Sequence, residues 1–185
     1  KGLGAPIPEG FQKIPTHFVY DVKHCGRHKA RVVAGGHRTE VPVDSVYSGV
    51  VSLAGVRIVT LLAELNDMEL WGTDIGNAYL ESYTKEKVAF IAGPEFGEFN
   101  GHTFVIIKAM YGLRSSGARW HDRLFDSLSG MGFTPCKSDP DIWMRACVDH
   151  YEYIACYVDD LLIASKKPQG IIDALMAKPN NYKLK

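Results

Sequence analysis

Two adjacent carboxylates, Asp159 and Asp160, interrupt an apolar stretch in the segment YVDDLLIAS. Like charges side by side repel each other, and burial increases the repulsion, so such pairs persist mainly where cations offset them or where one carboxylate is protonated. Hard divalent ions such as Mg²⁺ prefer oxygen ligands and also retain water or phosphate oxygens. A solvated turn is the alternative, because Asp is common in turns of every function. The pair alone does not decide between the two.

A third acid, Asp74, ends another apolar segment, in the sequence TDIGNAY. If the two strand ends are neighbours in one sheet, three carboxylates converge on one point. Together with a phosphate-bearing substrate, they would make a sufficient site for a divalent metal. We therefore expect Asp74 to come within coordination reach of Asp159 and Asp160.

Apolar periodicity and turn residues predict the elements that must position these acids. Strands are expected at 17–23, 28–34, 69–75, 88–93, 102–110, 141–148, 151–158 and 161–164, and helices at 52–66, 116–129 and 169–177. Residues 24–27 and the pair Asn100 and Gly101 are expected to form hairpin turns. Strands and helices segregate along the chain, and hairpins require antiparallel pairing. We therefore predict an α+β fold, an antiparallel sheet with helices packed on one face.

Composition limits the class of protein and its partners. With 185 residues, 46% of them hydrophobic and 23% charged, the chain can bury one sizeable core or two small ones. The formal net charge is zero, so a nucleic acid would have to be held by local clusters of Lys and Arg. No apolar run approaches the roughly 18 residues of a membrane span, and no membrane partner is expected. Without an initiator Met or a signal peptide, the chain is expected to be an excerpt of a longer protein.

Cysteines and aromatic residues receive plain structural interpretations. The four cysteines form no CxxC motif, which favours a reducing, intracellular setting over a zinc ribbon or a disulfide framework. A metal site at His24, Cys25 and His28 lacks a nearby fourth ligand, so a solvated hairpin tip is favoured. The large rings expected in the core, rather than stacked on bases, are Trp120, Phe133 and Trp143.

Six segments in order resemble one protein family. TDIGNAYLES and YVDDLLIAS resemble the first and third acidic motifs of reverse transcriptases, and KAMYGLRSSGARWHDRL between them resembles the YGLKQxPRAW segment of copia-type LTR retrotransposon polymerases. HKARVVAGG is similar to that family's YKARLVARG, YSGVVSL to its FSPVV, and GFTPCKSDPDIWM to its GFxxSxxDPCLF. These matches cover nearly the whole chain.

The resemblance implies an RNA-directed DNA polymerase of the right-hand type, with an antiparallel palm and a fingers subdomain. In such nucleotidyltransferases two Mg²⁺ ions about 3.5 to 4 Å apart, with Mn²⁺ as an alternative, activate the primer 3′ hydroxyl and stabilise the leaving pyrophosphate. Asp74 and Asp159 would be the main metal ligands, Asp160 would complete the site, and Ile75 is assigned to it.

Further matched positions would bind the nucleotide. Tyr79 would lie beneath the incoming sugar and favour deoxynucleotides, with a core aromatic as the alternative. Lys29 and Arg31 would face the triphosphate, with an exposed strand face as the alternative. Backbone amides from Ile75 onward would also reach the triphosphate, because small residues allow close approach. These further residues are Gly76, Asn77 and Ala78.

Template and primer would be contacted by two of the motifs. Tyr111, Gly112 and Arg114 would touch the template and the nucleotide, with a simple turn into the next helix as the alternative. The third acidic motif adds Tyr157 and Val158. The implied partners are an RNA or DNA template with its primer, deoxynucleoside triphosphates, and the integrase and RNase H parts of a polyprotein. The implied location is intracellular, in a cytoplasmic particle or the nucleus.

The domain expectation follows from the same resemblance. Residues 1–68 would be mainly a fingers-like hairpin with the first packing helix, and residues 69–185 mainly the palm. Only 25 residues follow Asp160, so the chain is expected to stop before the thumb and RNase H, to bind nucleic acid weakly and to show poor processivity.

Several departures from the family pattern keep other functions open. Gly35 and Gly117 stand where the family has Arg and Pro. They leave the metal ligands intact but weaken the expectation for nucleotide and template binding. The main alternative is therefore a catalytically decayed, nucleic-acid-binding or structural remnant of the same element. A metal-dependent phosphohydrolase using the three acids is disfavoured, because the chain offers no His-rich second shell.

Overall fold

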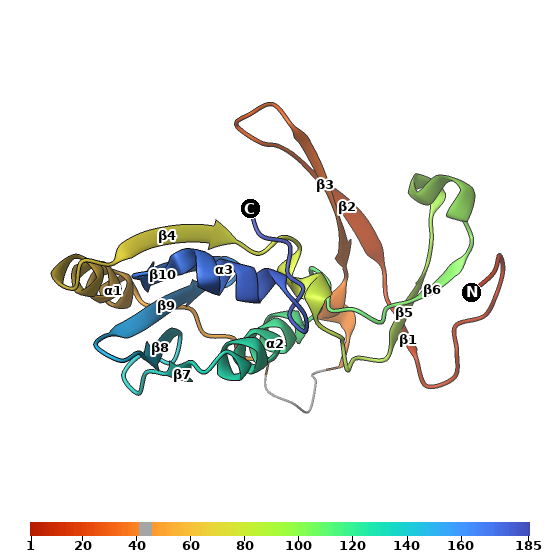
Figure 1. Cartoon of the computed structure of the whole chain (residues 1–185). Helices are drawn as coiled ribbons and strands as arrows, with labels where there is room; N and C mark the ends of the chain where they lie inside the picture. Colours follow the sequence, from red (N-terminus) through yellow and green to blue (C-terminus); the bar gives the residue numbers. More distant parts are fainter. Residues whose placement is uncertain (41–45) are drawn as a thin grey trace. The chain divides into compact units, whose positions relative to one another are not determined.

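The computed structural model describes residues 1–40 and 46–185 (Figure 1). The chain divides into two compact units. Unit 1 comprises Lys1–Tyr47 and Tyr79–Trp120, and unit 2 comprises Ser48–Ala78 and His121–Lys185. This division differs from the boundary expected between residues 68 and 69. The physical reason is that helix α1 (Leu53–Leu65) packs on the sheet of unit 2 rather than with the N-terminal hairpin.

Unit 2 is built on a five-stranded sheet in which all neighbouring strands are antiparallel, as predicted. Its order in space is β4 (Glu69–Asp74), β10 (Asp160–Ser165), β9 (Tyr151–Tyr157), β8 (Ile142–Ala146) and β7 (Thr134–Pro135) (Figure 1). Strand β10, the second half of the YVDDLLIAS motif, is therefore an inner strand with a partner on each side. This gives the acidic turn a fixed position between two neighbours.

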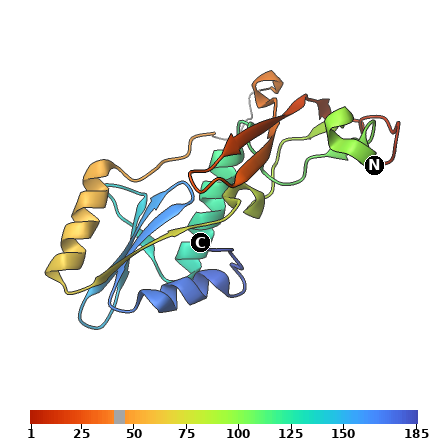
Figure 2. The same cartoon turned by 90° about the horizontal axis from the view of Figure 1, so that it is seen from above.

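Helices cover both faces of this sheet, so the prediction that helices pack on one face only is wrong. Leu162 and Ala164 of β10 belong to the same apolar cluster as Val59 and Ala63 of α1, whereas Leu161 points to the opposite face. On that face α3 (Pro168–Met176) contacts β10 and β4, and Figure 2 shows α1 and α3 on opposite sides of the sheet. A strand buried on both faces loses its polar alternation, which explains the continuous apolar run after the acids.

Other elements of unit 2 support the strands. The Ser52 side chain caps α1 by accepting a hydrogen bond from the Gly55 N–H, as expected of an N-cap serine. Helix α2 (Ser116–Gly130) begins in unit 1 and continues into unit 2, where the Ser127 hydroxyl lies 2.6 Å from the Tyr182 hydroxyl. Trp143 and Phe133 are almost fully buried in unit 2, and Trp120 in unit 1, which confirms their expected core role.

Unit 1 contains the predicted basic hairpin and a small second sheet. The hairpin pairs β2 (Thr16–Val22) with β3 (His28–Ala34), close to the predicted ranges. The second sheet has the order β1 (Gln12–Lys13), β5 (Val88–Ile91) and β6 (Thr103–Val105), with β1 parallel to β5. A 3-10 segment, Pro94–Phe99, separates β5 from β6, so the Asn100 and Gly101 turn does not close a tight hairpin and β6 is shorter than expected.

Within the described ranges, every helix is too short or too polar to span a lipid bilayer.

Candidate active site

The turn between β9 and β10 consists of Val158 and Asp159, and it holds a strained backbone. Val158 has a φ of 56°, whereas the φ of Asp159 is not positive. A two-residue hairpin with a positive φ at its first position alone is a type II′ turn, which normally has Gly there. A β-branched residue at positive φ is a true outlier, and such strain is concentrated at functional sites. The strain therefore marks this turn as a candidate functional site.

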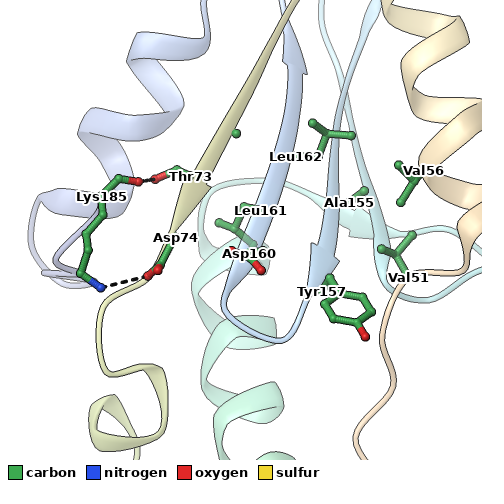
Figure 3. A pocket seen from close by; sticks show the side chains of 11 residues that line it. Val51, Val56, Thr73, Asp74, Ala155, Tyr157, Asp160, Leu161, Leu162 and Lys185 are labelled. Atoms are coloured by element: carbon green, nitrogen blue, oxygen red, sulfur yellow. Dashed lines mark hydrogen bonds and ion pairs between the residues drawn. The ribbon is translucent and has the colours of Figure 1, made fainter. Parts of the chain in front are cut away.

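Asp74 and Asp160 lie directly opposite each other in the β4–β10 ladder. Opposed residues of an antiparallel pair point to the same face, and both side chains line one pocket of about 470 Å³ together with Val51, Tyr157 and Leu162 (Figure 3). The Ile75 N–H donates a 2.8 Å hydrogen bond to the Asp159 carbonyl, which ties the two strand ends together. The structure thus brings the segments of the three acids to one end of the sheet.

The charges of the acids interact. Burial raises the pKa of the Asp160 carboxyl above its ordinary value, and the nearby negative charges of Asp159 and Asp74 raise this pKa further. Ionised Asp160 therefore destabilises the folded chain unless a cation lies nearby.

A cation, the ammonium group of Lys185, lies beside Asp74, and the sequence reasoning missed it. Residues 183–185 pair with the free edge of β4, where Asp74 and Lys185 exchange backbone hydrogen bonds of 3.2 and 3.0 Å. The Lys185 ammonium lies 3.2 Å from Oδ1 of Asp74 (Figure 3). Alternation of Tyr182 and Leu184 with two lysines is a period-two strand signal that could have indicated this edge segment.

The donor set of the site fits a hard divalent cation, because all three candidate ligands are carboxylates and their mutual repulsion needs positive charge. The acids are more widely spaced than a closed metal site. Within residues 1–40 and 46–185, the three possible metal-ligand atoms that lie within 4.8 Å of one another belong to Cys147, His150 and Glu152 and not to the three acids. Asp74 is turned toward Lys185 instead (Figure 3).

Two backbone amides expected to meet the triphosphate are already engaged. The Ile75 N–H donates to Asp159, and the Gly76 N–H donates a 2.8 Å hydrogen bond to the Lys183 carbonyl. In this structure the two amides therefore serve edge pairing with residues 183–185 and the contact with the acidic turn. Asn77, at a φ of 56°, and Ala78 follow directly where the chain leaves this sheet.

In unit 1, three residues predicted to bind nucleotide or template lie together. The ring centroids of Tyr79 and Tyr111 are 4.9 Å apart at an interplanar angle of 51°, and the Arg31 guanidinium lies 5.4 Å from the centre of the Tyr111 ring. Lys29 precedes Arg31 by two residues in β3 and so shares its face of the strand. These residues form a cationic and aromatic group, of the kind that contacts phosphates and sugars.

Gly112 and Arg114 have structural roles that the sequence did not indicate. Gly112 has a φ of 91°, and a Cβ there would lie 2.0 Å from the carbonyl oxygen of Ala34. Arg114 donates hydrogen bonds of 3.0 Å to the carbonyls of Gly36 and His37. The glycine is therefore required by close packing on β3 rather than by an open surface, and the guanidinium is already committed to the adjoining loop.

Comparisons with known proteins place the chain in a family. A family model described as "Reverse transcriptase (RNA-dependent DNA polymerase)" matches residues 5–185. The Retrovirus-related Pol polyprotein from transposon TNT 1-94 of Nicotiana tabacum is 26% identical over 180 residues, which cover 91% of this chain and 13% of that protein. The corresponding polyproteins from transposons RE1 and RE2 of Arabidopsis thaliana are 29% and 27% identical, over 90% and 86% of this chain and 12% and 11% of their own lengths.

The chain thus spans about an eighth of the relatives it matches, and the match of the family model extends over nearly all of it. The acids at one sheet end and the order of the motifs agree with that match. The chain belongs to the reverse transcriptase (RNA-dependent DNA polymerase) family and is related to copia-type retrotransposon Pol polyproteins.

Proposed function

We propose that the chain is the nucleotidyl-transfer part of an RNA-directed DNA polymerase, which extends a primer on an RNA or DNA template with deoxynucleotides. The observation that carries this proposal is the direct opposition of Asp74 and Asp160 across β4 and β10, with Asp159 in the strained turn beside them. Unit 2 then corresponds to a palm and unit 1 to a fingers-like part. Family membership supports the reaction type, and the sheet supports the choice of residues.

Asp74, Asp159 and Asp160 would hold Mg²⁺ in this proposal, or Mn²⁺ in its place. Held by these carboxylates, the metal would supply activation of the primer hydroxyl and stabilisation of charge on the leaving pyrophosphate. The protein contributes rigidity, because β10 is paired on both sides and the Ile75 N–H holds the Asp159 carbonyl. Tyr157 is half exposed in the same pocket, where its ring can meet the primer end.

Arg31, Tyr79 and Tyr111 would bind the incoming nucleotide. A guanidinium over an aromatic ring keeps its charge available to phosphate while its stem is fixed. The Tyr79 ring, held by its contact with Tyr111, is suited to discriminate against a ribose 2′ hydroxyl by contact. We therefore expect loss of the Tyr79 ring to reduce preference for deoxynucleotides, and loss of Arg31 to raise the KM for nucleotide.

Primer extension tests the proposal. The purified chain is given a primed RNA template, deoxynucleotides and Mg²⁺, and product is compared for wild type, Asp159→Asn and Asp67→Asn. Asp67 is a matched control, since it is an exposed acid in a turn at a φ of 50°, a conformation that Asn tolerates well. Extension by wild type and Asp67→Asn but not by Asp159→Asn is expected. Equal extension by all three would remove these acids from the mechanism.

A non-catalytic remnant that still binds nucleic acid is the second candidate. Two contacts favour it, because each uses a group that catalysis would need. The Lys185 ammonium lies beside the Asp74 carboxylate, and the Gly76 N–H is hydrogen-bonded to the Lys183 carbonyl. Fluorescence anisotropy with a labelled primed template separates the two functions. Binding without extension at any Mg²⁺ or Mn²⁺ concentration would establish the remnant, whereas extension that rises with the metal would exclude it.

A further inference from the structure

The turn that joins β8 to β9 gathers three side chains of different chemistry. Cys147 and His150 lie at its two ends, and the Cys147 N–H closes the turn with a 2.8 Å hydrogen bond to the His150 carbonyl. Glu152 follows in β9, and its side chain is 8% exposed. One donor atom from each of these three residues lies within 4.8 Å of the other two.

His150 is oriented by a neighbouring carboxylate. Its Nδ1 lies 2.6 Å from Oδ1 of Asp149, and the other Asp149 oxygen accepts a 3.1 Å hydrogen bond from the Lys166 ammonium. An Nδ1–H that donates to Asp149 leaves Nε2 with a lone pair. In the part of the chain that the structure describes, this Nε2 is buried and has no hydrogen-bond partner. A buried, unpaired nitrogen is unfavourable and calls for a ligand.

Glu152 is held in place by groups that leave it able to coordinate. The Arg145 guanidinium donates to Oε2 at 2.6 and 3.0 Å, and the Ser165 hydroxyl donates to Oε1 at 2.5 Å. Each carboxylate oxygen has two lone-pair positions, so these bonds orient the group without exhausting it. The Cys147 sulfur lies within 4.8 Å of a Glu152 carboxylate oxygen, and a bound metal would take the place of the thiol proton.

We propose that Cys147, His150 and Glu152 form a zinc-binding site at this hairpin tip. Sulfur, imidazole and carboxylate together are the ligands of Zn²⁺, whereas the hard ion Mg²⁺ avoids thiolate. The carboxylate on the far nitrogen of a ligating histidine is the usual supporting arrangement. Zn–S and Zn–N bonds of about 2.3 and 2.0 Å place tetrahedral ligands roughly 3.3 to 3.8 Å apart, so the tip needs to contract by at most about 1 to 1.5 Å.

The zinc site and the acidic turn lie at opposite ends of β9. His150 immediately precedes Tyr151, the first residue of that strand, whereas Val158 immediately follows Tyr157, its last. Three protein ligands leave one position for water, and no part of the proposed polymerase reaction uses the site. Its role is to fix the β8–β9 hairpin, so it stands or falls independently of polymerase activity.

Metal content measures the site directly. The full chain is equilibrated with Zn²⁺ in an excess of Mg²⁺, desalted and assayed by atomic emission, and Co²⁺ replaces Zn²⁺ for absorption spectroscopy. One retained zinc per chain, a thiolate-to-cobalt charge-transfer band and a zinc-dependent rise in the thermal midpoint are expected. Both Cys147→Ser and His150→Gln should lose all three signals. Asp149→Asn, which alters only the support of His150, should weaken binding about 10- to 100-fold.

Controls exclude the other candidate ligands. Cys25→Ser removes the exposed thiol of the β2–β3 hairpin, and Asp159→Asn removes a carboxylate of the acidic turn. Both variants should keep the zinc and the cobalt band. Cys147→Ser keeps a small polar side chain beside Glu152. Circular dichroism checks that this variant is folded, and His150→Gln gives an independent second test. Zinc retained by both of these variants, zinc lost with Cys25→Ser, or no zinc retained by wild type would each overturn the proposal.

Discussion

The Lys185 ammonium lies 3.2 Å from Oδ1 of Asp74, the residue directly opposite Asp160 in the sheet. The side chains of the pair are 55% and 40% exposed, so water screens their attraction. Ion pairs of this kind contribute about 0.2 to 1 kcal/mol. Lys185 therefore competes with a divalent ion for Asp74, but only weakly.

Replacing Lys185 by Met should raise the affinity of the acidic turn for Mn²⁺ about two- to five-fold, because the competing ammonium is removed. Electron paramagnetic resonance titration of free Mn²⁺ measures the change. Lys183→Met is the matched control, since Lys183 joins the same edge segment through its backbone carbonyl. Equal Mn²⁺ affinity in wild type and Lys185→Met would show that Lys185 does not compete for Asp74.

Asp160→Asn should stabilise the chain at neutral pH in the absence of divalent metal. The folded state raises the pKa of this carboxyl, so the folded chain binds protons more tightly than the unfolded chain and loses stability as pH rises through this range. Asn removes that loss. We expect a thermal midpoint about 1 to 2 °C above that of wild type at neutral pH.

The pH dependence identifies the cause of this gain. The gain from Asp160→Asn should vanish below the ordinary carboxyl value of 3.8, where Asp160 is protonated in both states, and grow as pH rises through the raised pKa. Asp67→Asn, at an exposed acid outside the acidic turn, should show no such trend. A gain that is constant from acid to neutral pH would mean that charge repulsion is not its source.

Local patterns predicted most of the elements and the neighbouring strand ends that place Asp74 opposite Asp160. The hairpin of β2 and β3, helix α1 and the β9–β10 turn follow from alternation, periodicity and turn residues, which act over a few neighbours. The presence of helices on both faces of the sheet could not be predicted in this way, because a continuous apolar run in β10 does not indicate which element covers each face. Lys185 was missed for a related reason, since it meets Asp74 across 111 positions in the sequence.

Gly112→Ala should destabilise the chain by at least about 2 kcal/mol. A Cβ at this position would lie 2.0 Å from the Ala34 carbonyl oxygen, and the φ of 91° disfavours any side chain. Gly130→Ala is the matched control, because a Cβ there meets nothing within 4 Å and Ala favours the helix α2 that Gly130 ends. Urea denaturation gives both values. If Gly112→Ala lowers the free energy of unfolding by much less than this, close packing does not explain the glycine, and its predicted contact with the template would again be the explanation.

Val158→Gly should stabilise the fold while weakening metal binding. Strain of about 1 to 3 kcal/mol at the φ of 56° is relieved by Gly, and the extra backbone entropy of Gly offsets about 0.5 to 1 kcal/mol of that gain. Val158→Ala keeps a Cβ in the same conformation and should give no gain. Urea denaturation compares the three proteins, and Mn²⁺ titration shows whether the looser turn holds Asp159 less firmly. If Gly and Ala have the same effect on stability, the backbone of the turn is not strained by its side chain, and the rigidity of the acidic site must come from the strands alone.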